Sequence, residues 1–417
     1  MTLIIFTHSY PYDYAAEHTF ISREITYLVE RFDQVVLVPK ACKGTRLSLP
    51  SSVEIDETYA EFLKANLPPG RLIKQVYRSG NLSGEIQKDK KILLYPSKIF
   101  KLIMFSGKAG LTRRWMTEWI KTRQVTAGNC ILYSYWFDHT ATGLGMLKEE
   151  FPGIKVISRA HGYDIYDEYY YPYYWPFRRE TLEVLDMLFF ASEAGREYFC
   201  DRYPEYISKY QTAHLGIGDP GFVSKPSGDN VFRIVSCSTI VSVKRLGLLL
   251  EGLAFMARLR RGQKFEWVHF GDGQDRKSLK RKIRQNFPSN IKGNFFGYMP
   301  NHEIMRYYKD QPSDVFVNVS ETEGGAPVSI QEAISCGIPV VATSVGGNPE
   351  IVSDKNGILL NPNPTPEEIA MALLKIWDDP TLAAKMRKES RRVWQTSYNA
   401  DVNFRNFAER LKSIGES

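Results

Sequence analysis

Two glutamates and two glycine pairs lie within one short segment, ETEGGAPVSIQEAISCGIPVVATSVGG at residues 321–347. A helix that only connects two buried strands requires none of these features, so we interpret the segment as part of a binding site. Glycines directly before a helix leave backbone N–H groups accessible, and the positive end of the helix favours phosphate. An ionised carboxylate accepts hydrogen bonds from two hydroxyls, as a ribose diol offers. A nucleotide-sugar, with phosphates in its middle and hydroxyls at both ends, would use all of these groups.

The position of each group around the predicted helix suggests its role. Pro327 suits the first turn of that helix. Ile330 is expected to face the sheet, whereas Glu332 lies about 200° further round the helix and is expected off the buried face. Glu332 is therefore the candidate for ribose hydroxyls and Glu323 the candidate for sugar hydroxyls. The phosphate candidates are the backbone N–H groups at Gly324 and Gly325.

Three other segments place polar groups at the ends of predicted strands. Lys244 or Arg245 could neutralise a diphosphate, although a solvated basic helix start would look the same. Gly271 and Gly273 follow another strand but lack the third glycine of a dinucleotide fingerprint. His161 follows a strand of the first half, at the end where open α/β sheets bind ligands. A lone histidine is often structural, and the neighbouring glycine and aspartate leave both alternatives open for His161.

Short β-branched and aromatic runs alternate with helical patterns along the whole chain, which predicts parallel sheets covered by helices. Residues 216–230 are rich in Gly, Pro, Ser and Asp and read as a linker between two halves. We therefore predict an α/β protein with two doubly wound domains that face each other across a cleft. The predicted strands of the first half are 3–6, 35–39, 130–136, 154–160, 186–192 and 212–217, and those of the second half are 232–238, 265–271, 294–298, 314–320, 338–344 and 357–362.

Composition indicates an ordinary globular protein of a reducing compartment. Of the 417 residues, 43% are apolar and 24% are charged. The five cysteines are scattered and form no CxxC pair, which argues against a zinc site or a disulfide framework. The first residues lack the basic start of a signal peptide, and no apolar run is long enough to span a bilayer. We expect a cytoplasmic chain.

The net charge of +7 is unevenly distributed, because residues 64–123 hold fourteen Lys and Arg residues against three acidic residues. Within this stretch, residues 90–123 interleave cations with Ile, Leu, Phe, Met and Trp. Three alternatives remain: a helix that packs on the first sheet with a solvated basic face, a peripheral contact with an anionic membrane or lipid-linked substrate, or a nucleic-acid surface. No aromatic–glycine signature of nucleic-acid binding accompanies the charge, so we expect no nucleic-acid partner.

The pattern EGGAPVSIQEA…GIPVVATSVGGNPEIV…NGILL resembles the C-terminal signature of the family 4 retaining glycosyltransferases. The segments SYPYDYAAEHTFISREITYL, SRAHGYDIYDE and FFASEAGREYF are similar to a bacterial polysaccharide-building branch of that family. The resemblance implies the GT-B fold, with an acceptor-side Rossmann-like domain at 1–222 and a donor-binding domain at 223–393. It also implies that residues 394–417 form a helix that crosses back to the first domain.

The resemblance implies a role for each matching residue. Glu332 would hold the nucleotide ribose, Glu323 the transferred sugar, Lys244 the donor diphosphate, and His161 would lie beside the sugar at the site of reaction. Gly324 and Gly325 match the loop whose backbone touches the donor, and Tyr298 lies near where family members hold the base. The resulting assignment has His161, Lys244 and Glu323 as catalytic residues; the donor-binding residues are Glu332, Gly324, Gly325, Ala326, Pro327, Val328, Thr239, Arg245, Gly271 and Tyr298.

The sequence departs from the family pattern at three places. Eight residues separate the two glutamates, where the family usually has seven. Thr239 occupies the position of an arginine that usually contacts the diphosphate, so Arg245 is the candidate replacement. Ala15 and Ala16 stand in a first loop that usually carries glycines.

The resemblance implies transfer of a hexose-type sugar, with retention, from a UDP- or GDP-sugar to a saccharide or lipid-linked acceptor in capsule or other cell-surface polysaccharide synthesis. Fixed cations and helix N-termini at the leaving diphosphate would stabilise its charge, so neither a metal nor another cofactor is expected. Closure of the two domains would exclude water. The alternative is a non-catalytic protein of the same fold that binds a nucleotide-sugar or a polysaccharide.

Overall fold

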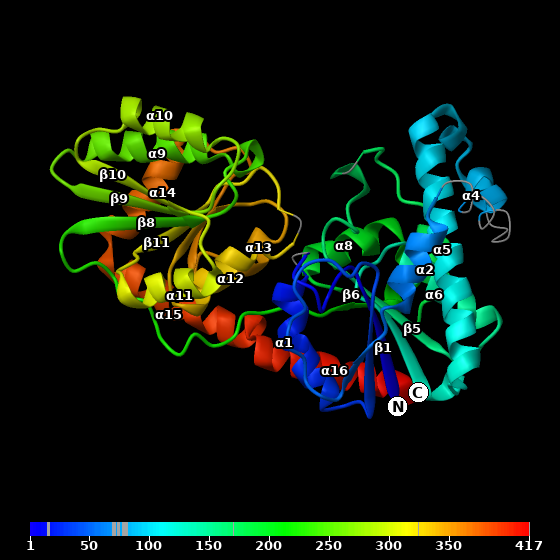
Figure 1. The fold of residues 1–417 in the computed structure, drawn as a ribbon. Coiled ribbons are helices and arrows are strands. Elements are labelled where there is room, and N and C mark those ends of the chain that lie inside the picture. The colour runs from blue at the N-terminus through cyan, green and yellow to red at the C-terminus, as the bar shows by residue number, and fades with distance from the viewer. Residues whose placement is uncertain are drawn as a thin grey trace. The chain divides into compact units, whose positions relative to one another are not determined.

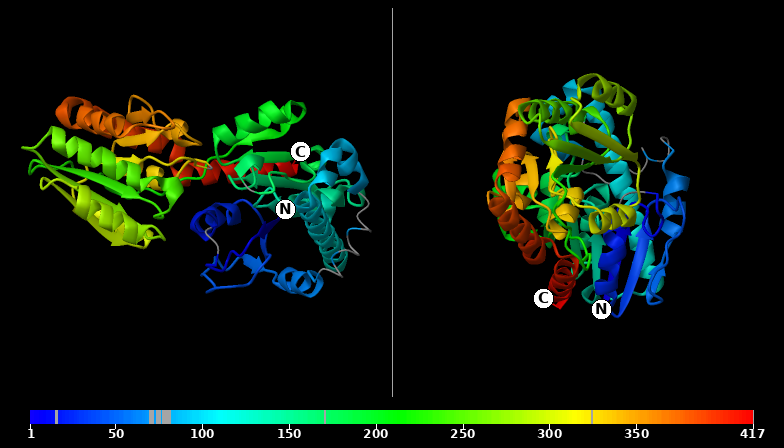
Figure 2. Two further views of the ribbon diagram at one scale, coloured as in Figure 1. Left: turned by 90° about the horizontal axis from the view of Figure 1, so that it is seen from above. Right: turned by 90° about the vertical axis from the view of Figure 1, so that its left-hand side faces the viewer.

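The computed structural model describes residues 1–14, 17–68, 72, 76, 82–169, 171–323 and 325–416. The chain forms two compact units, of which unit 1 comprises Met1–Leu215 with Val402–Ser417 and unit 2 comprises Gly216–Asp401. Each unit has a fully parallel sheet with helices on both faces, as Figure 1 and Figure 2 show. The predicted α/β class with two doubly wound sheets is thereby confirmed.

The sheet of unit 1 has seven strands in the order β3-β2-β1-β4-β5-β6-β7. Alternate residues of β1 point to opposite faces, so that Leu3 and Ile5 belong to one apolar core and Ile4 and Phe6 to the other. A strand buried on both faces reads as a continuous apolar run, which explains the sequence LIIF. The strands are β1 (Thr2–Thr7), β2 (Gln34–Pro39), β3 (Val53–Ile55), β4 (Cys130–Ser134), β5 (Lys155–Ala160), β6 (Met187–Phe190) and β7 (Tyr210–Thr212).

The two faces of this sheet are covered by different helices (Figure 1). One face packs against α1 (His18–Val29) and the C-terminal helix α16 (Ala400–Glu416), and the other packs against α2 (Thr58–Asn66), α5 (Pro96–Arg123) and α6 (His139–Gly145). Phe407 of α16 lies in the first of these cores, so the end of the chain belongs to unit 1. The remaining helices are α4 (Leu82–Lys88), α7 (Arg178–Val184) and α8 (Glu193–Arg202).

The sheet of unit 2 has six strands in the order β10-β9-β8-β11-β12-β13. One face packs against α9 (Leu246–Leu259), α10 (Arg276–Asn286) and α14 (Pro366–Asp378), and the other against α11 (Asn301–Asp310) and α12 (Val328–Ser335). The remaining helices are α13 (Asn348–Ile351) and α15 (Pro380–Val393). The strands are β8 (Val231–Cys237), β9 (Lys264–Phe270), β10 (Ile291–Gly297), β11 (Val315–Asn318), β12 (Val340–Thr343) and β13 (Gly357–Leu360).

One strand of the first half was missed, and one strand prediction for it was wrong. The short edge strand β3 was not predicted, because its three residues, only partly buried, leave no apolar run to recognise. The predicted strand at 212–217 is instead Tyr210–Thr212, and the residues after it leave the sheet. The predicted linker at 216–230 has no helix or strand, but backbone hydrogen bonds such as Ser224 N to Cys336 O (2.9 Å) attach it to unit 2.

Helix α5 shows which alternative holds for most of the basic segment. Pro96 begins it, and five of its apolar residues are buried in the core that includes the sheet, which supports the packing alternative: Leu111, Trp115, Met116, Trp119 and Ile120. The segment before Leu102 differs, because Leu94 is 72% exposed and Phe100 is 66% exposed. Among the helices formed by described residues, none is both long and apolar enough to cross a membrane.

Candidate functional site

The candidate site of unit 2 lies along the side of the sheet where its strands have their carboxyl ends, called here the edge of unit 2. Strands β9, β8, β11 and β12 are consecutive in the sheet and parallel, so the segments that follow them meet at the same edge. Backbone hydrogen bonds join these segments, among them Ile240 N to Asp272 O (2.9 Å) and Glu321 N to Val243 O (2.8 Å). The sequence had pointed to the same edge from three separate segments.

Lys244 and Glu323 form an ion pair at this edge, with 2.7 Å between Nζ and Oε1. Lys244 ends the short 3₁₀ turn after β8, and Glu323 follows β11. The amide of Asn318 donates to the same Glu323 oxygen at 3.0 Å. Both charged side chains are largely buried, at 23% and 11% exposure, so solvent screens the pair weakly. These two predicted residues therefore belong to one site.

The second glycine pair supports the loop that contains the first. A Cβ on Gly346 would lie 1.9 Å from the carbonyl oxygen of Glu323, and Gly346 also has a φ of +51°. A Cβ on Gly347 would lie 2.5 Å from the amide nitrogen of Ala326. Only glycine allows the two backbones this close, so the pair positions Glu323 and the start of α12. Gly324 lies outside the described residues, and Gly325 is part of the supported loop.

The N-terminus of α12 points out of this loop without a side-chain cap. Pro327 is the N-cap residue, and its carbonyl accepts from the amides of Ile330 and Gln331 at 3.1 Å each. The amides of Val328 and Ser329 come before the first intrahelical hydrogen bond and carry the positive end of the helix dipole. A helix start of this kind is suited to an anion.

Glu332 lies deeper than expected. The prediction that it would lie off the buried face was wrong, because its exposure is 6%. Ile330 faces the core as predicted, yet Glu332 is also enclosed by neighbouring segments, and Asn301 of α11 donates to its Oε1. Burial raises the pKa of Glu332 to about 7, while the Asn301 hydrogen bond lowers it.

Arg245 holds the scaffold together instead of presenting its charge. Its guanidinium donates to the carbonyl oxygens of Val319 (2.8 Å), Ser320 (2.7 Å) and Pro362 (2.6 Å) and to the side chain of Asn363 (3.0 Å). The donors that a diphosphate would need are thus occupied in this structure. Thr239 is exposed in the loop after β8 and brings no charge to the edge.

Gly271 is explained by chain packing. Its φ is +132°, and a Cβ there would lie 1.9 Å from the carbonyl oxygen of Ser238. Its amide donates to the carbonyl of Gly297 at 2.8 Å, which connects β9 to β10 beyond their regular pairing. Tyr298, the residue after Gly297, is 81% exposed, so its ring is accessible for stacking.

His161 belongs to unit 1, where it follows β5. Its Nε2–H donates to the carbonyl of Tyr135 at 3.0 Å, which leaves Nδ1 with a lone pair, and its ring stacks on that of Tyr135 at 4.8 Å. Burial, assisted by Arg159, lowers the pKa of His161 to about 3. The backbone amide of His161 donates to Asp164 at 2.7 Å. A neutral, oriented imidazole can accept a hydrogen bond but cannot serve as an acid at neutral pH.

Two further residues hold candidate groups in place, a third holds the loop after β1, and none of the three was predicted. Asn318 and Asn301 donate to the two glutamates of unit 2, as described above. In unit 1 the buried carboxylate of Glu17 accepts from the amides of His8 (3.0 Å), Ser9 and Tyr10 (2.8 Å). A polar residue inside the apolar run DVFVNVS was the signal for Asn318, whereas Asn301 and Glu17 become recognisable only through their partners.

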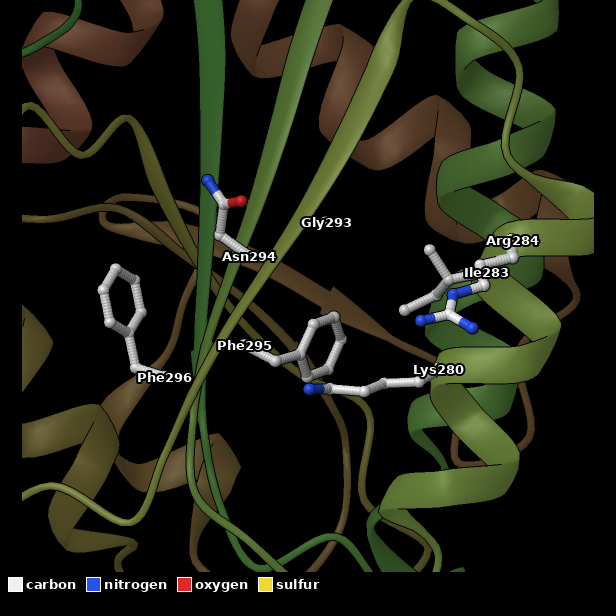
Figure 3. Close-up of a pocket in the computed structure, with 7 residues that line it drawn as sticks. All are labelled: Lys280, Ile283, Arg284, Gly293, Asn294, Phe295 and Phe296. Carbon is white, nitrogen blue, oxygen red and sulfur yellow. The ribbon is translucent and has the colours of Figure 1, made fainter.

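No group of three or more His, Cys, Asp or Glu side chains is arranged to hold a metal ion within the ranges the structure describes. A cavity of about 410 Å³ lies between α10 and β10, where Figure 3 shows Lys280, Arg284 and Phe295. None of the predicted site residues lines that cavity.

Comparison with known proteins identifies the domain that carries this site. Residues 222–393 match the family model of the glycosyl transferases group 1. The chain is 25% identical to the amylovoran biosynthesis glycosyltransferase AmsK of Erwinia amylovora. The match extends over 186 residues, which are 44% of this chain and 45% of the relative. It is 26% identical over 277 residues to the putative colanic acid biosynthesis glycosyltransferase WcaL of Escherichia coli K12, covering 62% and 64%. The chain thus spans between about half and two thirds of these curated relatives.

Solved structures extend the likeness to the whole chain. The lipopolysaccharide outer core galactosyltransferase WaaB superposes with a TM-score of 0.69 at 13% identity, and Alr3699/HepE from Anabaena, in complex with UDP, with a TM-score of 0.63 at 15% identity. Each match covers 99% of both chains. Residues 222–393 therefore form a glycosyl transferases group 1 domain, and the chain has the GT-B fold, which confirms the resemblance recognised in the sequence.

The close contact of Gly346 with the Glu323 backbone predicts that adding one methyl group at Gly346 lowers both stability and ligand affinity. In Gly346→Ala the new Cβ would overlap the Glu323 carbonyl, so the loop must shift and the free energy of unfolding should fall by roughly 2 kcal/mol or more. The affinity for uridine or guanosine diphosphate should fall with it. Denaturant unfolding and calorimetric titration measure the two effects. Gly228→Ala, where a Cβ meets nothing within 4 Å, is the matched control, and equal behaviour of the two variants would contradict the assignment.

The buried carboxylate predicts a pH-dependent stability. The pKa of Glu332 rises from 4.5 in the unfolded chain to about 7 in the folded chain. The free energy of unfolding is therefore highest below pH 4.5, where Glu332 is protonated in both states, and it falls as the pH rises through about 7, where the buried carboxylate becomes charged. Glu332→Gln should therefore gain stability relative to the wild type over this range, by up to about 3 kcal/mol. It should also bind nucleoside diphosphate more weakly. Unfolding at pH 5 and pH 8 tests this, with Glu303→Gln at an exposed position of α11 as control; a constant difference across pH would refute it.

Proposed function

We propose that the chain is a glycosyltransferase that moves a hexose-type sugar from a UDP- or GDP-sugar to a saccharide or lipid-linked acceptor during synthesis of a capsule or another cell-surface polysaccharide. The observation that carries this proposal is the edge of unit 2, where Lys244, Glu323 and the uncapped start of α12 lie together inside the group 1 domain. The names of the relatives AmsK and WcaL support a role in polysaccharide synthesis. The UDP and UDP-glucose complexes of Alr3699/HepE support a nucleotide-sugar donor.

Each group of the edge has a role in holding the donor. The amides at the start of α12 and the ammonium group of Lys244 bind the diphosphate, whose charge increases as the sugar leaves. Glu332 accepts from the ribose hydroxyls, and the exposed ring of Tyr298 stacks on the base. Glu323, which Lys244 and Asn318 orient, accepts from hydroxyls of the transferred sugar.

The reaction is proposed to proceed with retention at the anomeric carbon. The bond between that carbon and the diphosphate oxygen breaks as the acceptor hydroxyl oxygen bonds to the same face of the sugar. The departing phosphate oxygen takes the hydroxyl proton, so no side chain has to act as a base. This fits His161, whose lowered pKa and fixed Nε2–H make it a positioning group that accepts a hydrogen bond through Nδ1.

The positive charge for the leaving group is proposed to come from the chain itself. Lys244 and the uncapped start of α12 would both face the leaving diphosphate and would stabilise its charge as a metal ion otherwise does. We therefore propose transfer without a metal. The alternative, a non-catalytic protein that binds a nucleotide-sugar or polysaccharide, would use the same donor groups and would show binding without turnover.

We further propose that unit 1 contacts an anionic membrane through a patch formed by Leu93, Leu94, Tyr95 and Phe100, called here the α5 patch. All four residues are at least half exposed, and they lie in the turn before α5, at its N-cap or in its first turns. The exposed Lys90 and Lys91 precede them. Apolar side chains flanked by lysines are suited to the boundary between headgroups and acyl chains.

Turnover of a donor panel tests the proposed enzyme. The chain should release nucleoside diphosphate from one of a series of UDP-, GDP- and ADP-sugars in the presence of saccharide and lipid-linked acceptors, and at the same rate in EDTA as in Mg²⁺. Lys244→Ala should lower kcat by about 10²-fold or more, since it removes charge stabilisation at the leaving group. Lys277→Ala on the exposed face of α10 is the control. Binding of a donor without any release would favour the non-catalytic alternative.

Vesicle sedimentation tests the α5 patch. The wild-type chain should sediment with vesicles of phosphatidylglycerol and phosphatidylcholine at low salt, and the double variant Leu94→Ser/Phe100→Ser should lose most of this binding. Ile207→Ser, also an exposed apolar position of unit 1, is the control. Binding that survives in the double variant would exclude the patch as the contact.

A further inference from the structure

Unit 1 contains a cavity that none of the predicted donor residues lines. It measures about 380 Å³ and lies where β1, β2 and β4 end, between α2 and α5. Its polar lining consists of His8, Lys40, Lys101, Lys108, Asp138, His139 and Tyr163, and its apolar lining includes Leu63, Leu67, Phe105 and Trp175. The cavity lies within unit 1 alone.

The lining carries an excess of positive charge. Lys40 is paired with Asp138, at 2.6 Å between Nζ and Oδ2, and Asp138 is the one carboxylate of the lining. Within the described ranges, neither Lys101 nor Lys108 has a carboxylate at ion-pairing distance. Both ammonium groups are partly buried, and burial lowers the pKa of each. Removing a cation from water without a partner is unfavourable, so an anion in the cavity would be stabilised by these two lysines.

Helix α5 places Lys101 and Lys108 on the same side of the cavity. Lys101, Phe105 and Lys108 are spaced four and three residues apart on α5, so they share one face. The ammonium group of Lys101 lies 4.8 Å from the centre of the Trp175 ring. Phe105 in turn packs edge-on against Trp175 and His139, with ring centres 6.2 Å and 5.9 Å apart. The cavity therefore combines fixed positive charges with an aromatic and aliphatic wall.

We propose that this cavity binds the diphosphate group of a lipid-linked acceptor, with the first part of its apolar chain against Leu63, Leu67 and Trp175. Two unpaired ammonium groups match a ligand of at least two negative charges better than a single carboxylate. The one lining carboxylate already accepts from Lys40, Tyr163 and the amide of Thr140, so it is not available for the ribose of a nucleotide. Lys101 directly follows Phe100 of the α5 patch, so the cavity lies next to the proposed membrane contact.

This inference rests on the proposed function only in naming the ligand as the acceptor; the binding of an isoprenoid diphosphate stands by itself. Farnesyl diphosphate is the probe for calorimetric titration of the full chain. It should bind with one site per chain, inorganic pyrophosphate should compete with it, and farnesol should not. Uridine diphosphate, which we place in unit 2, should bind without displacing it.

Two variants separate the two sites. Lys101→Gln/Lys108→Gln should weaken the binding of farnesyl diphosphate by about tenfold or more and leave the affinity for uridine diphosphate unchanged. Lys244→Ala should do the reverse. Lys121→Gln, at the far end of the same helix and about 20 Å along its axis from Lys108, is the control. The thermal unfolding midpoint of the double variant should stay close to that of the wild type, because its lysines have no ion pair with a described residue and only the contact of Lys101 with the Trp175 ring is lost.

Each outcome decides one of the two proposals. Unchanged binding of farnesyl diphosphate in the double variant, or no binding in the wild type, would overturn the inference even if the chain turns over a nucleotide-sugar. Displacement of the probe by uridine diphosphate, abolished in the double variant, would assign the cavity to the donor and overturn it as well. Binding of the probe as expected, without turnover of any donor, would leave the cavity assignment in place and remove the proposed enzyme.

Discussion

The site of unit 2 depends on the contact between two stretches of backbone that no side chain could allow. Gly346 and Gly347 lie directly against the backbone of Glu323, Gly325 and Ala326, at distances where a Cβ would overlap a carbonyl or an amide. This contact fixes where the loop after β11 ends and where α12 begins. The direction of Glu323, the open helix start and the depth of Glu332 all follow from it, because each belongs to the supported loop or to the helix that it starts. A similar contact, of Gly271 with Ser238, holds the neighbouring loop after β8.

Charge is arranged differently in the two units. In unit 2 the cation expected to face a diphosphate is paired with a carboxylate, and a second carboxylate is buried with a raised pKa, so the edge is nearly balanced in charge. In unit 1 two lysines face a cavity without a carboxylate partner among the described residues. A balanced edge suits a ligand that brings both hydroxyls and phosphates. An unbalanced cavity with an apolar wall suits a compact anion attached to an apolar chain.

Long periodic segments of the sequence predicted the fold well, since a strand buried on both faces must be apolar throughout. Eleven of the twelve predicted strands overlap strands of the structure at the predicted place, and the twelfth shares only Thr212 with β7. Strand β3 could not be predicted, because three half-buried residues carry no periodicity. Arg245 was taken for a diphosphate ligand for a related reason. An arginine next to a glycine-rich loop gives the same sequence pattern whether its guanidinium faces a ligand or, as here, donates to three carbonyl oxygens of its own chain.

The sequence by itself determined the fold class, the two sheets and the residue types at the edge of unit 2, because apolar periodicity and the positions of Gly, Glu and Lys are local properties of the chain. The tertiary structure alone decided how those residues act. Whether Glu332 is exposed depends on α11, which lies outside its own helix, and whether Lys244 is paired depends on a loop some eighty residues away. The cavity of unit 1 is the clearest case, since its lysines come from the residue after β2 and from α5 and become a site only where the fold brings these segments together.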